Sequence, residues 1–282
     1  MSIRIDHEAT CPEISPPLCA TTELPKHEHH QSVDWLRVGP SFGVGLGKGM
    51  QLSASVPIDL RALGIEYTLP NGKAYDPPYG DIHHRNETLF GPVDGTLMFQ
   101  GFRVFGDSPW TLGAGLGTTL PWGKTHPDPF VLGSKGKTHQ HFQLGTGTFV
   151  PLADLQVVLA GRLGGNAWVV SRVPLYANGH GYFPGYQTGW GIGPRYMVAA
   201  RYTAALTVEG THQWRDAWNN NPSPSSGRDA LMAGFANNVR VSGRVGIYGK
   251  GVVTMWQASR SSNEKDQLLQ RFVATLGVTF QG

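Results

Sequence analysis

Histidines are the residues of this chain whose grouping most suggests chemistry. Eleven occur among 282 residues, mainly in short clusters. Neutral imidazole is a good ligand for copper and zinc, and nearby carboxylates such as Glu28 and Asp81 could complete a site. The candidate metal ligands are His27, His29, His30, His83 and His84. Their spacing fixes no coordination geometry, so histidines that only form hydrogen bonds at the surface are the competing interpretation.

Charged residues within stretches of alternating polarity form a second set. By that alternation they share the polar faces, where cations outnumber carboxylates. We expect the following residues to line an internal lumen: Asp59, Arg61, Asp94, Arg162, Arg195, Glu209, Arg240, Lys250 and Arg271. Facing one another across a pore, such groups select polar or anionic solutes. In a small barrel they could instead pair and fill the interior, and the sequence leaves both possibilities open.

Enzyme chemistry finds less support in the residues. A hydrolase needs a nucleophile, a histidine and an orienting polar group within hydrogen-bond reach. His212, beside Trp214, is the strand histidine expected on the outer surface near a rim, but no nucleophile elbow or His-Ser couplet accompanies it. The Gly-rich runs at 43–47 and 113–117 are not followed by a helix, which excludes a phosphate-binding loop. We predict a protein that is not an enzyme, with a lipid hydrolase as the less favoured alternative.

The two cysteines, Cys11 and Cys19, lie in a proline-rich segment. We expect a disulfide between them, because an exported protein reaches compartments where disulfides persist. Two free thiols in an N-terminal tail are the alternative.

The elements that must position these residues are β-strands. Apolar and polar side chains alternate over residues 49–62, and period two indicates a strand rather than a helix. One face carries Met50, Leu52, Ala54, Val56, Ile58 and Leu60, and the other carries Gln51, Ser53, Ser55, Asp59 and Arg61. The pattern recurs in pairs of runs with small, polar second faces. This is typical of a transmembrane β-barrel, which has lipid outside and a wet lumen inside.

Eleven strands are expected from this pattern. They cover residues 33–46, 49–64, 92–105, 109–122, 138–151, 154–169, 186–199, 202–215, 229–241, 244–258 and 268–281. Bacterial barrels of this kind have an even number of strands, so we add a short first strand at Ser2–His7. We therefore predict an all-β, antiparallel, up-and-down transmembrane barrel of twelve strands. Residues 33–282 form the barrel, and the Pro- and His-rich residues 1–32 hold the short first strand and serve as a lid or plug.

Composition agrees with a barrel and excludes other classes. Charged residues make up only 15% of the chain, yet the mean hydropathy is −0.23, and no apolar run approaches the ~18 to 20 residues of a spanning helix. A net charge of +3 is too small to indicate nucleic acid as a partner. We expect a monomer in the bacterial outer membrane, in contact with lipid and lipopolysaccharide. Its export would use a signal peptide absent from this chain.

Three motifs together resemble a family of outer-membrane transporters named for the MetA pathway of phenol degradation. They are Gly91-Pro92-Val93-Asp94, Leu116-Gly-Thr-Thr-Leu-Pro-Trp-Gly123 and Leu144-Gly-Thr-Gly-Thr-Phe149. Pro92-Val93 and Trp122 depart from the family pattern. The resemblance implies a twelve-stranded barrel that passes small molecules, aromatic ones among them, and supplies no catalytic residues.

The expected function is therefore a channel for passive passage of small solutes, aromatic or anionic. The alternative is a filled barrel that binds copper or zinc through histidines at the cell surface.

Overall fold

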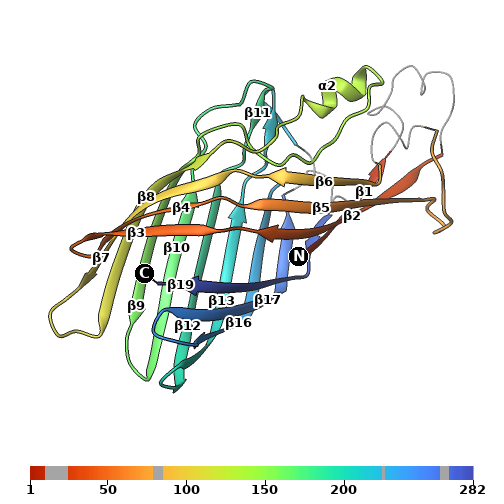
Figure 1. Ribbon diagram of the computed structural model, residues 1–282. Coiled ribbons are helices and arrows are strands. Elements are labelled where there is room, and N and C mark those ends of the chain that lie inside the picture. Colours follow the sequence, from red (N-terminus) through yellow and green to blue (C-terminus); the bar gives the residue numbers. More distant parts are fainter. Residues whose placement is uncertain (10–24, 79–84, 224–225, 261–266, 282) are drawn as a thin grey trace.

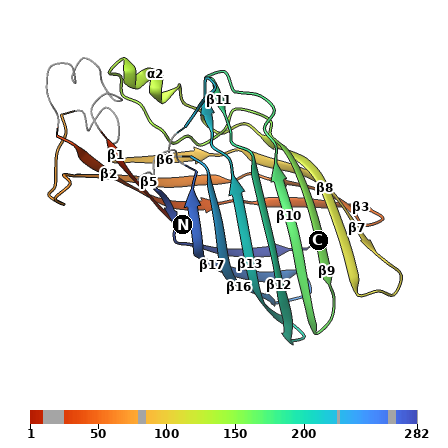
Figure 2. The same ribbon diagram turned by 180° about the vertical axis from the view of Figure 1, so that it is seen from behind.

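The computed structural model describes residues 1–9, 25–78, 85–223, 226–260 and 267–281. They form an antiparallel up-and-down β-barrel (Figures 1 and 2). The segments of the wall are β1 (Ser2–Ala9), β2 (His27–Val38), β3 (Ser41–Gly47), β4 (Met50–Ser55), β5 (Ile58–Thr68), β6 (Glu87–Pro92), β7 (Gly95–Val104), β8 (Trp110–Leu120), β9 (Pro151–Leu159), β10 (Leu163–Arg172), β12 (Gln187–Ala199), β13 (Tyr202–Gln213), β16 (Arg228–Arg240), β17 (Val245–Ser259), β18 (Gln267–Gln270) and β19 (Phe272–Phe280).

Several of these segments are two halves of one long strand, interrupted by a kink. β2 continues into β3 across Gly39-Pro40, and β4 continues into β5 across Val56-Pro57. Proline cannot donate a ladder hydrogen bond, which explains the break at these two points. β6–β7 and β18–β19 are likewise interrupted at Val93-Asp94 and at Arg271. Counting each pair as one strand, the described wall has twelve strands, the number predicted from the alternation together with the rule of an even strand number.

The kinks divide the wall into two sheets. One has the order β18-β1-β2-β5-β6, and the other has the order β19-β17-β16-β13-β12-β10-β9-β8-β7-β4-β3. β1 pairs with both β2 and β18, so the first strand joins the second strand to the last. The expected short strand at Ser2–His7 is thus present, and it extends to Ala9.

Long connections gather at one end of the barrel, called here the loop end, and short turns gather at the other, the turn end. The loop end carries residues 121–150 with helix α2 (Pro129–Ser134), and a small sheet of β11 (Tyr182–Phe183), β14 (Ala217–Trp218) and β15 (Asn221–Pro222). Figure 1 shows α2 and β11 above the loop end of the wall.

Toward the turn end, β3 and β19 form the two edges of the larger sheet, and the described residues contain no ladder between them. β1 lies between β2 and β18 but begins at Ser2. In Figure 1 the N-terminus is seen between the strands β3 and β19. The smaller sheet also has two edges, β18 and β6, so in the described residues hydrogen-bonded ladders do not close the wall completely in either half.

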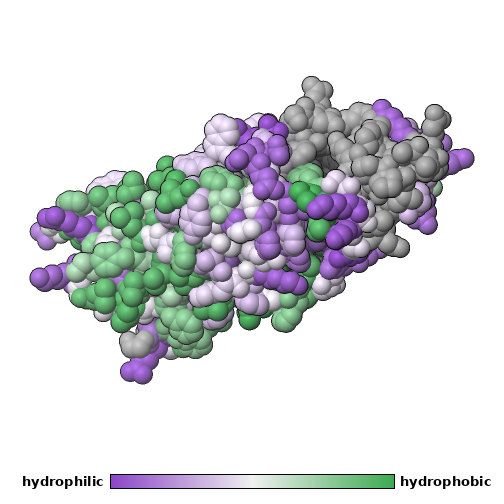
Figure 3. Space-filling view, turned by 90° about the horizontal axis from the view of Figure 1, so that it is seen from above, coloured by the Kyte–Doolittle hydropathy of each residue, from purple (hydrophilic) through white to green (hydrophobic). Residues whose placement is uncertain are grey.

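The two faces of the wall differ in chemistry, as the alternation requires. The outward face exposes large apolar side chains, for example Leu116 at 70%, Leu206 at 61% and Leu276 at 80%. Figure 3 shows apolar side chains over much of the wall on the viewed face. Apolar exposure of this extent would be costly in water but suits a hydrocarbon environment. No helix of the described residues is long and apolar enough to cross a membrane.

Two segments differ from the prediction. Residues 138–149 form no strand, because Gly145 and Gly147 interrupt the alternation and Leu144 is buried inside the barrel. The strand expected at 154–169 is instead two strands, β9 and β10, joined by the turn 160–162. The two errors compensate, so the total of twelve was unaffected.

The N-terminal boundary also differs. Residues 27–32 belong to β2, so the barrel wall includes part of the expected lid or plug, and β1 belongs to it as well. Residues 10–24, with Cys11 and Cys19, lie outside the described part of the chain, so the expected disulfide stays a prediction.

Candidate functional site in the barrel interior

The connection between β8 and β9, residues 121–150, folds into the barrel and is called here the inner loop. Its Leu144 packs in a buried apolar cluster with Val33, Leu63, Leu89 and Val93, which come from the wall strands β2, β5 and β6 and from the kink after β6. These wall side chains share the inward face with the buried Asp59 and Arg61. The contact therefore lies inside the barrel, and the inner loop narrows the lumen at the loop end.

Asp94, at the kink between β6 and β7, holds the inner loop in place. Its Oδ1 accepts a hydrogen bond from the Gly123 amide at 3.1 Å, and its Oδ2 accepts two from Thr146, at 2.6 Å from N and 2.6 Å from Oγ1. The Trp122 indole donates to the Val93 carbonyl at 2.6 Å. Hydrogen bonds to an ionised carboxylate are stronger than neutral ones, so Asp94 is the main polar anchor of the inner loop.

The three motifs that resemble the MetA-pathway family meet at this anchor. Gly123 ends the second motif, and its amide donates to Asp94 Oδ1. Gly145 lies in the third motif, and its amide donates to the carbonyl oxygen of Lys124. A Cβ atom at Gly145 would lie 2.5 Å from Asp94 Oδ1 and 2.5 Å from the Gly123 carbonyl oxygen. The approach of the backbones thus requires glycine at 145.

A second polar contact joins the inner loop to β5, the strand that pairs with β6. Asp59 is fully buried and accepts hydrogen bonds from Arg37 Nε at 2.6 Å and from Arg61 Nη2 at 2.6 Å. Arg61 Nη1 also donates to the carbonyl of Gln143 in the inner loop at 2.9 Å. The Trp35 ring lies 4.2 Å from the Arg61 guanidinium and 4.8 Å from that of Arg37. One carboxylate thus orients two guanidinium groups, and the cluster keeps a positive charge.

The middle of the lumen contains a separate ion pair. Lys250 Nζ lies 2.6 Å from Glu209 Oε1, and Thr207 donates a hydrogen bond to the same oxygen at 2.9 Å. β16 runs between β13 and β17, and Gly234 on β16 stands between Thr207 and Val252. The pair therefore spans an intervening strand whose inward face carries no side chain at that point.

Solved structures offer a comparison for this fold. The chain is similar to the COG4313 outer membrane channel from Pseudomonas putida F1, with a TM-score of 0.55 and 11% identity over 99% of this chain and 93% of that one. The NanC porin is similar over 99% of this chain and 98% of its own, with a TM-score of 0.45 and 9% identity. No family model and no curated protein matches the sequence. The fold is that of an outer-membrane β-barrel.

Within this barrel the expected lumen residues occupy different places. Asp59, Arg61, Glu209 and Lys250 lie on the inward face, and so does Arg195, whose neighbour across the strand pair is Ala205. Arg240 ends β16 near the turn end, and Arg271 lies exposed in the kink before β19. Asp94 faces the interior but is occupied by the inner loop.

Arg162 is the exception among the expected lumen residues. It lies in the turn between β9 and β10, and its guanidinium stands 5.5 Å from the ring of Tyr196. Tyr196 pairs with Leu163, which is 71% exposed on the outward face. Arg162 therefore belongs to the outer surface at the turn end, because the turn falls where a continuous strand was expected.

Three lumen arginines were missed: Arg37, Arg172 and Arg228. Arg37 lies on the same face of β2 as Trp35, so alternation alone could have identified it. Arg172 ends β10 and was assigned to a loop, because the β9–β10 turn was not recognised. Arg228 begins β16, one residue before the expected start of that strand.

The histidines do not assemble into a metal site in the described residues. His27 and His29 are buried on the inward face of β2, with ring centroids 5.0 Å apart, and they pack near Tyr67 and Tyr75. His30 points outward, where its Nε2 lies 2.9 Å from Thr68 Oγ1. Strand alternation separates His30 from the other two, and His83 and His84 lie outside the described residues. Among the described side chains, no group of three or more His, Cys, Asp or Glu could hold a metal ion.

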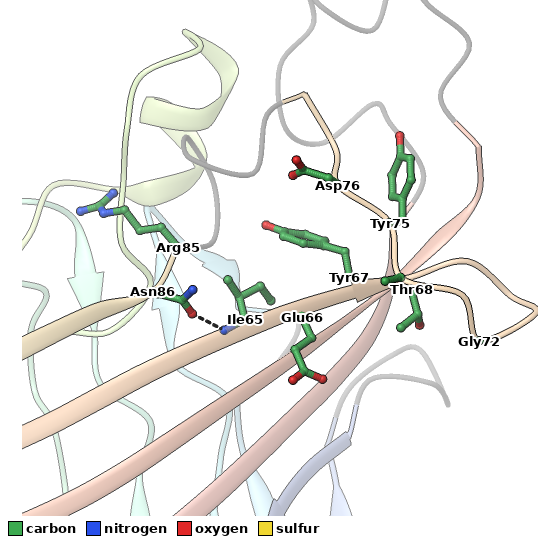
Figure 4. A pocket seen from close by; sticks show the side chains of 10 residues that line it. Ile65, Glu66, Tyr67, Thr68, Gly72, Tyr75, Asp76, Arg85 and Asn86 are labelled. Carbon is green, nitrogen blue, oxygen red and sulfur yellow. Dashed lines mark hydrogen bonds between the residues drawn. The ribbon is translucent and has the colours of Figure 1, made fainter.

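A recess of about 800 Å³ opens at the loop end of β5 (Figure 4). Tyr67, Tyr75 and Arg85 are among the residues that line it. Figure 4 shows Glu66 pointing to the other side of β5 from Tyr67, and Asn86 accepting a hydrogen bond from the Ile65 amide at 2.9 Å. The charged groups around the recess do not converge on one point, so the recess lacks the geometry of a binding site.

His212 lies on the outward face near the loop end, as expected. Its Nδ1 is 2.6 Å from Asp229 Oδ1, and Arg260 Nη2 lies 2.9 Å from Asp229 Oδ2. The Arg260 guanidinium also stacks on Trp214, with 4.7 Å to the ring centroid. In the described part of the chain, no Ser, Thr or Cys side chain is hydrogen-bonded to His212, so the arrangement lacks the nucleophile of a hydrolase.

Proposed function

We propose that this protein is a bacterial outer-membrane channel through which small polar solutes diffuse, and that the inner loop forms its constriction. In the outer membrane, the loop end faces the outside of the cell and the turn end faces the periplasm. The protein acts as a monomer surrounded by outer-membrane lipid and lipopolysaccharide.

One observation carries the proposal over the alternative of a filled barrel. The side chains of Arg37 and Lys250 point into the interior, yet they remain 46% and 32% exposed. Side chains that filled the barrel would bury these groups, because protein interiors are closely packed. Charged groups that are enclosed by the wall but accessible to solvent are expected of a wet lumen.

Further support comes from the two faces of the wall. The outward face is apolar along the strands, whereas the inward face carries Gln51, Gln100 and Asp154, which are linked by hydrogen bonds of 2.8 and 3.2 Å. A polar inner surface of this kind lowers the cost of moving a hydrated solute through the membrane. The resemblance to the MetA-pathway family adds aromatic molecules to the candidate solutes, and this stays a prediction.

The test is single-channel recording of the refolded full chain in a planar bilayer, alongside the variant Asp94→Ala. We expect steady current steps from the native chain and larger or more frequent openings from the variant, because the inner loop loses its anchor. Asp107→Ala, in the exposed turn after β7, is the matched control and should leave the current unchanged. Silence of both the native chain and Asp94→Ala, with folding confirmed by the heat-dependent shift in gel mobility, would favour the filled barrel instead.

A further inference from the structure

Arg172 is a cation in the lumen without a partner among the described residues. It ends β10, is exposed, and has no hydrogen bond or ion pair with any residue of the described chain. The charges that act on it are those of Arg37 and Asp94. Asp94 is occupied by Gly123 and Thr146, so it offers Arg172 little neutralisation.

Strand register places Arg172 in a row of polar groups on the inward face. Arg172 pairs with Gln187 on β12, Gln187 pairs with Gln213 on β13, and Gln213 pairs with Arg228 on β16. Residues that pair directly across antiparallel strands point to the same face, with Cβ atoms about 4.5 to 5.5 Å apart. Glu209, Thr211 and Gln213 are every second residue of β13, so their side chains share one face. That face is the inward one, because Glu209 meets Lys250 in the lumen.

Arg228, at the far end of the row, is also incompletely satisfied. Its Nη2 donates to Gln270 Oε1, while its Nη1 is buried without a hydrogen-bond partner among the described residues. A buried donor without a partner is costly, and a ligand that accepts its hydrogen bond recovers that cost.

The charges at this level of the lumen do not balance. Arg37, Arg61, Arg172 and Arg228 supply four guanidinium groups. Among the described residues, the carboxylates near this level are Asp59, saturated by Arg37 and Arg61, and Asp94, saturated by the inner loop, together with Asp216, which accepts a hydrogen bond from the Gly185 amide at 2.7 Å. Each of these carboxylates accepts hydrogen bonds from the protein. A solute that passes the inner loop therefore meets guanidinium groups and amides, but none of these carboxylates without a hydrogen-bond donor.

We propose that Arg172, Gln187, Gln213 and Arg228 form an anion-binding arc on the lumen wall that selects small solutes bearing a carboxylate. Guanidinium presents a planar fork of donors that matches a carboxylate, and the glutamine amides add donors along the wall between the two arginines. The arc rests on the proposed channel function and specifies the class of solute that the channel favours.

The test measures the reversal potential of the native chain and of Arg172→Gln in a tenfold gradient of potassium chloride. We expect the native channel to prefer chloride, and Arg172→Gln to reduce the chloride-to-potassium permeability ratio by about fivefold, since one unit charge at contact distance has an effect of this order in water. Arg172→Lys should keep this selectivity. It should lose block by sodium benzoate, because the ammonium lacks the fork, and neutral benzamide should block neither protein.

Arg162→Gln is the matched control, because it removes the same charge from the outer surface at the turn end. Selectivity that is unchanged in Arg172→Gln, or that changes equally in Arg162→Gln, would overturn the arc while leaving the channel intact. If the folded native chain is silent, the channel proposal fails, and the arc is tested by calorimetric titration with sodium benzoate. Heat lost in Arg172→Gln but kept in Arg162→Gln then supports the arc, and equal heats in all three proteins overturn it.

Discussion

Carboxylates and guanidinium groups in this barrel have two different roles, and their hydrogen bonds distinguish them. Asp94 and Asp59 are saturated by protein donors, so they hold the inner loop and the neighbouring arginines in place. Arg172 has no such partner in the described chain, so it is available to a solute. Satisfied charges thus determine shape, whereas the unsatisfied one provides binding.

Gly145→Ala tests the anchor at the residue scale. The added methyl would lie 2.5 Å from both Asp94 Oδ1 and the Gly123 carbonyl oxygen, so the loop must move and lose hydrogen bonds to Asp94. We expect the docked inner loop to lose about 3 kcal/mol, which combines overpacking with the loss of a charged hydrogen bond. Limited proteolysis between residues 121 and 150 measures this. Gly179→Ala is the control, because no atom lies within 4 Å of its Cβ position; equal protease resistance of the two variants would contradict the anchor.

At the scale of elements, the inner loop is the part of the barrel whose position depends on a few side chains. Its contacts with the wall are the apolar cluster around Leu144, the anchor at Asp94 and the hydrogen bond from Arg61 to Gln143. Its histidines add a dependence on pH. Burial lowers the pKa of both His126 and His139, and the neighbouring Lys124 adds to the effect at His126.

Acidification should therefore loosen the inner loop. A histidine with a lowered pKa is neutral when docked, so protons bind preferentially to the released loop, and docking weakens as pH falls below the ordinary histidine value of about 6.5. We expect more frequent channel openings at pH 5 than at pH 7, recorded in the same bilayer. The double variant His126→Gln, His139→Gln should lose most of this difference, whereas His30→Gln, on the outward face of β2, should keep it. A full pH effect in the double variant would assign the pH sensitivity to other groups.

For the whole molecule, the difference between the two faces of the wall is the main organising feature. In the larger sheet, the strands between its edges β3 and β19 are paired on both sides, whereas β3 and β19 are paired on one side only in the described residues. Leu206 and Thr207 lie next to each other on β13, inside the fully paired part of the wall. Leu206 is 61% exposed outward, and Thr207 donates inward to Glu209.

Arginine at these two positions should have opposite consequences. Leu206→Arg places a charge in lipid and should cost about 2 to 4 kcal/mol of unfolding free energy. Thr207→Arg places the same charge in the lumen beside the Glu209 carboxylate, so we expect a change below about 1 kcal/mol. Denaturant unfolding in lipid vesicles compares the two. If Thr207→Arg proved the more damaging, the assignment of the faces would be reversed.

Local sequence determined the strands and their faces, because alternation of period two is a property of neighbouring residues. The inward Asp59 and Arg61 and the outward Leu52 and Leu60 follow from that pattern alone. The same rule also separates His30 from His29, and applying it would have weakened the metal-site hypothesis at once. The even number of strands required the short strand at the N-terminus, which the structure contains.

The tertiary structure alone decided where residues 121–150 lie. Residues 138–151 alternate like a strand, but Leu144 is buried in the lumen by residues of β2, β5 and β6. Asp94 and Thr146 are 52 positions apart, and Arg61 and Gln143 are 82 apart. No local pattern encodes contacts over such separations, so only the tertiary structure reveals the constriction at the inner loop and the position of Arg172, which has no partner among the described residues. The outer position of Arg162 follows instead from the turn between β9 and β10.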